Sequence, residues 1–435
     1  MTSSHDAIVI GAGVIGASIA LGLARQGLKP LCVDMGAEAG HGSTSGSSSI
    51  IRPFYSTIDG ASIAYEAHFY WKDWAGFLGA EDERGYARYV NTGNLVVKCD
   101  RNDHMRGLLK VLDRIGCPYE EWNCERLQER FPAIVFDSYS PAKRFDHDSF
   151  GEPNGREISG AVFIPCGGYV TDPALAAHNM QRAAESNGAV FRFRAKVAEI
   201  LTGDGRVVGI ALDGGERIAA PVVVNASGPH SYKVNGLAPG VLDGMTIRTR
   251  ALREEVCHVP APQGIDYATV GMHFSDPDTA IYSRPDYGND MLLGSEGPDC
   301  DAHIWVDPDD FDRDFSDQWQ LQVMRLAQRF PTLGIPSRTK GVVEMYDIST
   351  DWIPIYDKSD LPGFYMAVGT SGNQFKNSPI VGQMMAELVA ACEAGHDHDA
   401  DPIQFPLKHT GLTADLGFYS RRREVNEASS FSVLG

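Results

Sequence analysis

Three glycines and one aspartate near the start of the chain have the types and spacing to bind a nucleotide. Gly11, Gly13 and Gly16 follow the pattern G-x-G-x-x-G directly after the apolar run at residues 6–10. In this pattern the first glycine allows a tight turn, the second lets a pyrophosphate approach the backbone, and the third lets a helix pack on a strand. Asp34 stands where a carboxylate accepts hydrogen bonds from adenosine ribose hydroxyls. These residues predict a dinucleotide site, against the alternative of a glycine-rich turn that binds nothing.

A second stretch of small residues, GHGSTSGSSS at residues 40–49, runs into Ile50-Ile51-Arg52. Small side chains let a ligand lie close to the backbone N–H groups. A nicotinamide dinucleotide needs no such second loop, whereas an extended flavin dinucleotide needs close backbone contact along its ribityl-pyrophosphate path. The loop therefore favours FAD, with candidate ligands Ser43, Thr44, Ser45 and Ser48.

The elements that would hold these residues are strand–helix–strand units. The hydrophobic pattern predicts strands at residues 6–10, 29–34, 190–193, 222–225 and 363–368, and helices at 14–26, 173–187 and 379–392. Asp172-Pro173 opens the second helix in the preferred order of cap and then proline. This alternation predicts a Rossmann-like sheet.

The segments between these units differ in composition. Residues 84–156 and 236–339 are richer in aromatic residues, Asp and Pro, and the stretch TGNLVVK alternates as in an antiparallel sheet. We therefore expect an α/β plus α+β protein with a discontinuous Rossmann-like FAD-binding domain at 1–83, 157–235 and 340–400. An antiparallel-sheet substrate domain at 84–156 and 236–339 would be interleaved with it. Residues 401–435 are predicted to form an irregular, arm-like C-terminal tail.

The composition limits the partners and the compartment. The formal net charge of −19 repels nucleic acid and anionic membrane surfaces. The eight cysteines are scattered without a CxxC pair, which disfavours a disulfide scaffold and indicates a reducing, cytoplasmic compartment. The apolar run at residues 7–24 lacks a basic flank, so we expect no membrane span and no secretion signal. Residues 396–401, HDHDAD, are interpreted as a solvated connector, and no metal site is expected.

The order of the motifs along the chain resembles one enzyme superfamily. After Asp34 and the Ser/Gly loop come GGYVTDP (167–173), VVVNASGPHS (222–231) and VGTSGNQFKNSPIVG (368–382). This order is similar to that of the D-amino-acid oxidase and sarcosine oxidase (DAO) superfamily of FAD-dependent amine oxidoreductases, closest to its sarcosine oxidase and dimethylglycine dehydrogenase types. The resemblance implies FAD as the cofactor, with further contacts from Val197, Ser227, Gly228, Gly369, Gly372, Asn373, Gln374, Phe375 and Lys376.

The resemblance also implies an anchor for the substrate. Arg52 and Lys376 fall on the two positions at which monomeric sarcosine oxidases hold the substrate carboxylate over the flavin. An arginine fork and a lysine ammonium together can fix a carboxylate and orient the neighbouring C–H bond. The alternatives are a loop arginine paired with an aspartate and a solvated lysine. Two further catalytic candidates are Tyr282, as a pocket wall or core residue, and Glu296, as a partner for an amino group or a solvated acid.

Three departures from the family pattern carry their own expectations. Glu344 in VEMY (343–346) stands where sarcosine oxidases tether the flavin to a cysteine, and Ser45-Gly46 stand where dimethylglycine dehydrogenases use a histidine. We therefore expect non-covalent FAD. Leu292 replaces a lysine that assists oxygen reduction, which favours a dehydrogenase without excluding an oxidase. Arg284 replaces an aromatic residue, and it either binds a second anionic group or lies on the surface among acids.

The predicted reaction is hydride transfer from a carbon beside a neutral amine to flavin N5, giving an imine that water hydrolyses. The expected substrate is a secondary or tertiary amino acid, N-methylated or cyclic. Rival hypotheses are a FAD-dependent D-amino-acid or 2-hydroxy-acid dehydrogenase, and a flavin-carrying subunit of an electron-transfer complex. The electron acceptor, either O₂ or an acceptor protein, and the oligomeric state are left open.

Overall fold

The computed structural model describes residues 5–433, and its central sheet has the strand order β20-β21-β13-β1-β2-β9. Edge strand β20 runs antiparallel, and the other strands run parallel to one another. Every residue of β1, β2, β13 and β21 is buried, as continuous apolar runs in parallel strands require. This confirms the predicted Rossmann-like sheet. The strands are β1 Ala7–Ile10, β2 Pro30–Val33, β9 Val190–Arg192, β13 Val223–Asn225, β20 Ile355–Lys358 and β21 Phe364–Val368.

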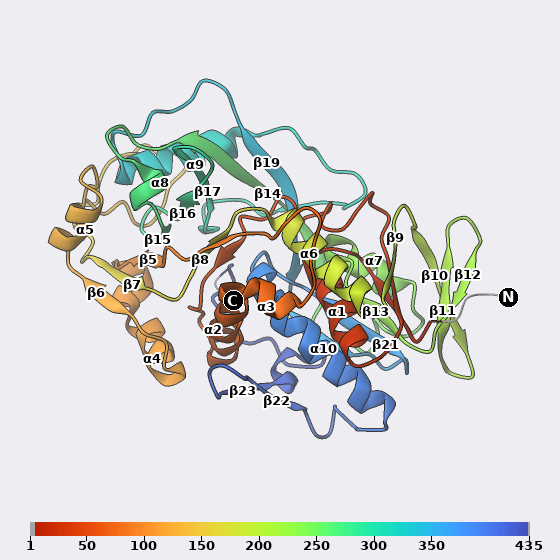
Figure 1. Ribbon diagram of the computed structural model, residues 1–435. Coiled ribbons are helices and arrows are strands. Elements are labelled where there is room, and N and C mark those ends of the chain that lie inside the picture. The colour runs from red at the N-terminus through yellow and green to blue at the C-terminus, as the bar shows by residue number, and fades with distance from the viewer. Residues whose placement is uncertain (1–4, 434–435) are drawn as a thin grey trace.

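Two layers cover this sheet. Helices α1 (Val14–Arg25), α6 (Pro173–Ser186) and α10 (Ser378–Glu393) pack together on one face (Figure 1). A small antiparallel sheet of β10 (Val197–Gly203), β11 (Arg206–Leu212) and β12 (Arg217–Ala219) covers the other face, where Ile8 of β1 shares a hydrophobic cluster with Ile210. The carboxyl ends of β1, β2 and β13 meet at one edge, which is where sheets of this type bind ligands.

A nine-stranded sheet forms the second domain, in the order β18-β14-β17-β16-β15-β5-β7-β6, with β19 also paired to β14. Helix α9 (Asp317–Arg329) packs on it through Trp319 and Leu326. Because β7 and β19 pair within this sheet, we propose substrate-domain boundaries of 84–164 and 236–349 instead of 84–156 and 236–339. The strands are β5 Asn94–Val97, β6 Glu120–Trp122, β7 Ala161–Ile164, β14 Thr249–Pro260, β15 His273–Asp276, β16 Ile281–Pro285, β17 Asp290–Ser295, β18 Ile304–Trp305 and β19 Gly341–Ser349.

Another three-stranded sheet joins the two domains and consists of β3 (Ile50–Ile51), β8 (Gly168–Val170) and β4 (Tyr89–Val90). Gly168 has a φ of +149°, and a Cβ there would lie 2.0 Å from the Val90 carbonyl oxygen, so only glycine lets these strands approach. Thr57 then caps helix α2 (Ile58–Lys72) by accepting from the Gly60 N–H. The remaining α-helices are α3 Trp74–Leu78, α4 Arg106–Ile115, α5 Cys124–Arg130, α7 Ser231–Gly236 and α8 Tyr267–Val270.

The C-terminal segment packs against the body of the protein, so the expected arm-like tail is wrong for its described residues. Strands β22 (Gln404–Pro406) and β23 (Thr413–Asp415) form a hairpin, and Leu416 and Tyr419 join the main hydrophobic core. The fully buried Arg421 binds Asp357 at 2.9 Å and Asp399 at 2.8 Å. The solvated connector at 396–401 is also wrong in part, because His398 is buried and Asp399 is ion-paired.

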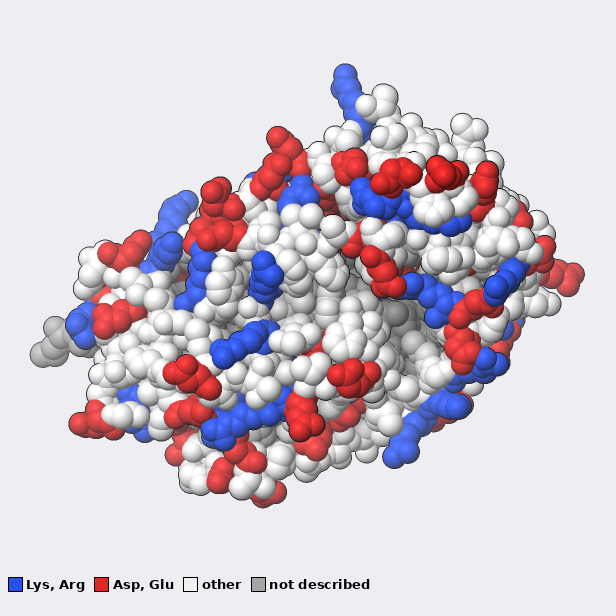
Figure 2. All heavy atoms as spheres, turned by 180° about the vertical axis from the view of Figure 1, so that it is seen from behind, with Lys and Arg blue, Asp and Glu red and all other residues white. Residues whose placement is uncertain are grey.

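No helix within residues 5–433 combines the length and the apolar character needed to cross a membrane. The apolar run at residues 7–24 forms β1 and most of α1 instead. Figure 2 shows acidic and basic side chains mixed over one face of the molecule.

Candidate active site

A cavity of about 880 Å³ lies between the carboxyl edge of the central sheet and the nine-stranded sheet. This volume falls in the range of cofactor and substrate pockets. Most of the predicted site residues line it: Gly11, Gly13, Asp34, Ser43, Thr44, Ser48, Arg52, Val197, Ser227, Gly228, Tyr282, Glu296, Gly372, Asn373, Gln374, Phe375 and Lys376.

Three predicted cofactor residues lie outside the cavity wall. Gly16 packs on the turn, where a Cβ would lie 1.8 Å from the Gly11 carbonyl oxygen. Ser45 is exposed, and its hydroxyl donates to the Gly42 carbonyl. Gly369 shapes a turn at a φ of +67° and donates its N–H to Asp347. These residues support the wall and do not form it.

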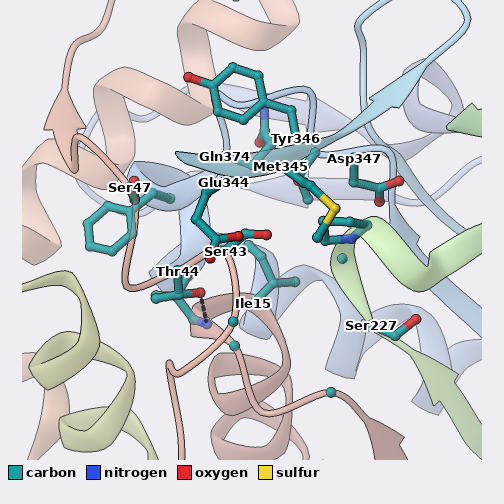
Figure 3. A pocket seen from close by; sticks show the side chains of 18 of the residues that line it. Ile15, Ser43, Thr44, Ser47, Ser227, Glu344, Met345, Tyr346, Asp347 and Gln374 are labelled. Carbon is teal, nitrogen blue, oxygen red and sulfur yellow. Dashed lines mark hydrogen bonds between the residues drawn. The ribbon is translucent and has the colours of Figure 1, made fainter. Parts of the chain in front are cut away.

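The glycine turn leaves the start of helix α1 open to the cavity. Gly11 has a φ of +103°, and a Cβ there would lie 2.4 Å from the Ala226 carbonyl oxygen. At Gly13 an added Cβ would meet only Thr44 Oγ1, at 3.1 Å. The Thr44 hydroxyl accepts from the Val14 N–H at 3.1 Å, the contact marked in Figure 3. Free N–H groups at a helix N-terminus form a binding site for a phosphate.

Asp34 closes the other side of this turn. Its two carboxylate oxygens accept from the Ala12 and Gly36 N–H groups, each at 2.6 Å. Each oxygen keeps a second lone pair for a ribose hydroxyl. The acid at the end of β2 is therefore held in the orientation that the sequence pattern predicts.

The opposite end of the cavity holds Arg52, which directly follows β3. Its side chain is 7% exposed, and its guanidinium carbon lies 5.2 Å and 4.8 Å from the ring centres of Phe54 and Tyr55. Nη2 donates to the Val433 carbonyl, while Nη1 is buried without a hydrogen-bond partner among the described residues. The alternative of an aspartate-paired loop arginine is not supported, since the guanidinium bonds a backbone carbonyl and no salt bridge among the described residues involves Arg52.

Lys376 lies beside Arg52 and is 1% exposed, which rules out a solvated lysine. Its ammonium nitrogen donates to the Tyr55 hydroxyl and to the Asn373 carbonyl. Burial, together with the nearby Arg52 cation, lowers the pKa of Lys376 well below its usual value. An anion bound between the two cations would stabilise the charged lysine, because an opposite charge offsets the cost of desolvation.

Two titratable groups from the nine-stranded sheet face the same end of the cavity. His273 is 2% exposed and bonds Asn94 through Nδ1 at 2.9 Å, and burial lowers its pKa well below its usual value. Its ring is therefore neutral at pH 7. Glu296 accepts from the Ser275 hydroxyl at 2.5 Å. Burial raises the pKa of Glu296 to about 7, against the opposing effect of Arg52.

Tyr282 and Arg284 lie on β16 but have different surroundings. The Tyr282 hydroxyl is 2.9 Å from the Ser48 hydroxyl, so it links the cavity wall to the Ser/Gly loop. Arg284 is 4% exposed, lies outside the cavity wall and donates Nε to the Ser48 carbonyl at 2.7 Å. Arg284 therefore lies neither in a second anion site nor on the surface, although Nη1 lies 3.7 Å from Asp286, one of the acids expected near it.

The segment Glu344–Asp347 of β19 forms another wall of the cavity, as Figure 3 shows. A Cβ on Gly46 would lie 2.6 Å from Glu344 Cγ, so the Ser/Gly loop packs directly on this glutamate. Asp347 is buried and accepts from the Ser231 hydroxyl at 2.7 Å and the Gly369 N–H at 2.6 Å. Burial raises the pKa of Asp347 to about 7.

Sequence reasoning missed several residues at the Arg52 end of the cavity. Tyr55 supports both cations, and its position three residues after Arg52 in RPFY was the available signal. His273, Ser275 and Val433 line the same cavity, but nothing in their local sequence indicates this. They reach it through sheet pairing and chain reversal over long sequence distances.

These residues fit an extended FAD. The open helix start and Asp34 suit the pyrophosphate and the adenosine ribose, and the Ser/Gly loop and Gly372–Phe375 offer backbone along the rest of the cavity. The fold and the cavity thus define a flavin-dependent oxidoreductase. The chain belongs to the DAO family of FAD-dependent oxidoreductases, whose family model matches residues 6–388.

Known relatives agree with this assignment. A "Probable sarcosine oxidase" of Arabidopsis thaliana is 26% identical over 410 residues, covering 90% of this chain and 89% of the relative. The L-proline dehydrogenase of P. horikoshii superposes with a TM-score of 0.75 at 19% identity, covering 97% and 98% of the two chains. The glycine oxidase of Geobacillus kaustophilus superposes with a TM-score of 0.73 at 20% identity, covering 98% and 100%. The two structures share the fold of this chain.

Proposed function

We propose that this enzyme oxidises the C–N bond of a secondary or tertiary amino acid, N-methylated or cyclic. The observation that carries the proposal is the pair of buried basic side chains, Arg52 and Lys376, at the end of the cavity away from the glycine turn. Two buried cations are costly unless an anion joins them, and a substrate carboxylate is such an anion. The named substrates of two relatives, sarcosine and L-proline, are both secondary amino acids.

The residues of this chain would position the substrate and keep water out. Arg52 and Lys376 would bind the carboxylate and so limit the orientations of the neighbouring α-carbon, and the rings of Phe54 and Tyr55 hold the Arg52 guanidinium in place. His273, held neutral by burial, adds no positive charge near the amine. FAD, when bound, supplies the hydride acceptor. A neutral amine then needs no dedicated base, and the imine product is hydrolysed by water.

The electron acceptor is proposed to be other than O₂. Leu292 is 4% exposed and packs beside Tyr282, so this position offers no cation to stabilise superoxide. A D-amino acid or a 2-hydroxy acid is the alternative substrate, because each carries the same carboxylate. A hydroxy acid would also need a base for its hydroxyl proton, and the neutral His273 is the candidate.

Product analysis separates these alternatives. With an artificial electron acceptor present, an N-methyl amino acid should yield formaldehyde and the demethylated amino acid, or methylamine and a 2-oxo acid. Release of ammonia from D-amino acids alone, or of a 2-oxo acid from 2-hydroxy acids alone, would replace the proposed substrate class with the corresponding alternative.

The FAD is expected to be bound without a covalent link. Glu344 occupies the wall where a tethering cysteine would stand, and Ser45 points away from the cavity. Precipitation of the purified protein with trichloroacetic acid should leave a colourless pellet and a yellow supernatant. A pellet that keeps its yellow colour after washing would contradict this expectation.

Carboxylate binding is expected to weaken as the pH rises through 7. Glu296 is mostly neutral below its pKa of about 7 and charged above it, where it competes for Arg52 and repels a substrate carboxylate. The Kd of a carboxylate inhibitor should rise about tenfold between about pH 6 and about pH 8. Glu296→Gln should reduce this rise, and Glu344→Gln, on a different wall, should preserve it. A Kd of the unsubstituted enzyme that stays constant over this range would contradict the assignment.

A further inference from the structure

The end of the described chain returns to the candidate active site. Val433 lines the cavity, and its carbonyl accepts a hydrogen bond from Nη2 of Arg52. Its side chain packs with Leu252 and Trp352 from the nine-stranded sheet and the loop after it. A neutral backbone oxygen thus accepts the hydrogen bond from the guanidinium nitrogen that a substrate carboxylate would need.

The base of this segment is firmly held. Arg423 forms a two-pronged ion pair with Asp351, with Nε–Oδ2 at 2.9 Å and Nη2–Oδ1 at 2.8 Å. Ser429 is 7% exposed and donates its hydroxyl to the Asp351 carbonyl at 2.6 Å. The chain is therefore anchored up to Ser429 on a buried aspartate.

The tip beyond Ser429 is held less firmly. Phe431 is 41% exposed although it is a large apolar residue. Its φ of +49° is a left-handed backbone conformation that is unfavourable for a residue other than glycine. The Ser430 hydroxyl is exposed. Among the described residues it bonds only the Ser432 hydroxyl, at 2.8 Å across the same turn. A strained and exposed turn is easily released from its anchor.

The bound tip leaves Arg52 without an open terminal nitrogen. Nη2 is occupied by Val433, and Nη1 is buried against the protein without a hydrogen-bond partner among the described residues. A carboxylate would form charge-assisted hydrogen bonds with this guanidinium, which are about twice as strong as bonds to a neutral acceptor. Substrate and tip therefore compete for one group, and the anion has the stronger interaction.

We propose that residues 430–433 form a displaceable lid whose Val433 carbonyl holds Arg52 until a substrate carboxylate replaces it. The inference rests on the proposed function, in which Arg52 is the carboxylate anchor. The lid would favour anionic ligands, because a neutral ligand gains too little at Arg52 to displace it. It would also keep the buried guanidinium partly satisfied when no substrate is present.

The test is a flavin-absorbance titration of the FAD-bound enzyme with propionate, a carboxylate that has no amine to oxidise. Deleting residues 430–435 keeps the Ser429 anchor and removes the competing carbonyl. Because the deletion removes a neutral acceptor that competes for the charged guanidinium, it should tighten propionate binding by about tenfold. Propionate binding that is unchanged or weaker in the deletion variant, with an unchanged circular dichroism spectrum, would overturn the lid.

A point variant tests the same lid in the full-length chain. Ser429→Ala removes the bond to the Asp351 carbonyl, and it should tighten propionate binding by about threefold, the effect of roughly half a hydrogen bond. Ser186→Ala removes a comparable hydroxyl-to-carbonyl bond in α6, far from the cavity wall, and should change nothing. Equal Kd values of the two variants for propionate would overturn the proposal of a lid.

Arg52→Met separates failure of the lid from failure of the proposed function. If Arg52 is the anchor, this variant should bind propionate much more weakly, and deleting residues 430–435 from it should have no further effect. If Arg52→Met binds propionate as tightly as the unsubstituted enzyme, the carboxylate anchor itself is wrong. If Arg52→Met binds propionate much more weakly but the full-length and deletion enzymes have the same Kd for propionate, the anchor stands and the lid is wrong.

Discussion

Replacing Arg52 by methionine is expected to lower kcat/KM for the amino-acid substrate by about 10²- to 10³-fold. Removing one partner of a buried, hydrogen-bonded charge pair costs about 2–5 kcal/mol, which corresponds to about 30- to 5,000-fold, and the expected loss lies in the middle of this range. Methionine keeps an unbranched side chain against Phe54 and Tyr55, so the loss should reflect the missing guanidinium. Steady-state kinetics under saturating acceptor would measure it.

Two variants serve as controls for the Arg52 prediction. Arg52→Lys keeps the charge but loses the fork, and it should recover only part of the activity. Arg338→Met removes an exposed arginine outside the cavity wall and should leave kcat/KM unchanged. The FAD content of Arg52→Met should equal that of the unsubstituted enzyme, because Arg52 lies far along the cavity from the glycine turn. Full activity of Arg52→Met would refute the carboxylate anchor.

Gly13→Ala is expected to weaken FAD binding by about 100-fold or more while the protein stays folded. The added methyl group would meet only Thr44 Oγ1, at 3.1 Å, so the chain itself can accommodate it. It would, however, stand at the start of α1, where the pyrophosphate must approach the N–H groups. Losing two charge-assisted hydrogen bonds at about 1.5 kcal/mol each gives this factor. Titration of the apoprotein with FAD, followed by flavin fluorescence, would measure the Kd.

Gly107→Ala is the matched control for Gly13→Ala. Gly107 lies within α4, where an added Cβ meets nothing within 4 Å, so the helix gains an alanine at no steric cost. Its FAD affinity should equal that of the unsubstituted protein. An unchanged FAD affinity in Gly13→Ala would mean that the pyrophosphate does not bind at this turn.

The sequence was informative wherever the signal is local. The turn at Gly11, the acid at the end of β2 and the cap at Asp172 each depend on a few neighbouring residues, and each lies where the pattern predicts. The long apolar runs likewise predict strands that are buried on both faces. Motif order then placed Arg52 and Lys376, which lie 324 positions apart in the numbering, in one cavity.

The sequence was uninformative where a contact joins segments that carry no motif. His273 reaches the cavity because β15 pairs in parallel with β5, where His273 stands opposite Asn94. Arg284 on β16 donates to the Ser48 carbonyl of the Ser/Gly loop, which is 236 positions away in the sequence. The tail folds back because the buried Arg421 and the partly buried Arg423 pair with aspartates far upstream. Charge pairing of this kind has no periodicity that a local pattern could reveal.

One measurement tests the proposed chemistry most directly. The flavin absorbance of the purified enzyme is followed under argon while N-methylated, cyclic, D-amino and 2-hydroxy acids are added one at a time. We predict bleaching by an N-methylated or cyclic amino acid, and slow return of the yellow colour when air is admitted. If none of the amino acids bleaches the flavin, although dithionite still reduces it, the proposal that this enzyme oxidises an amino acid is wrong.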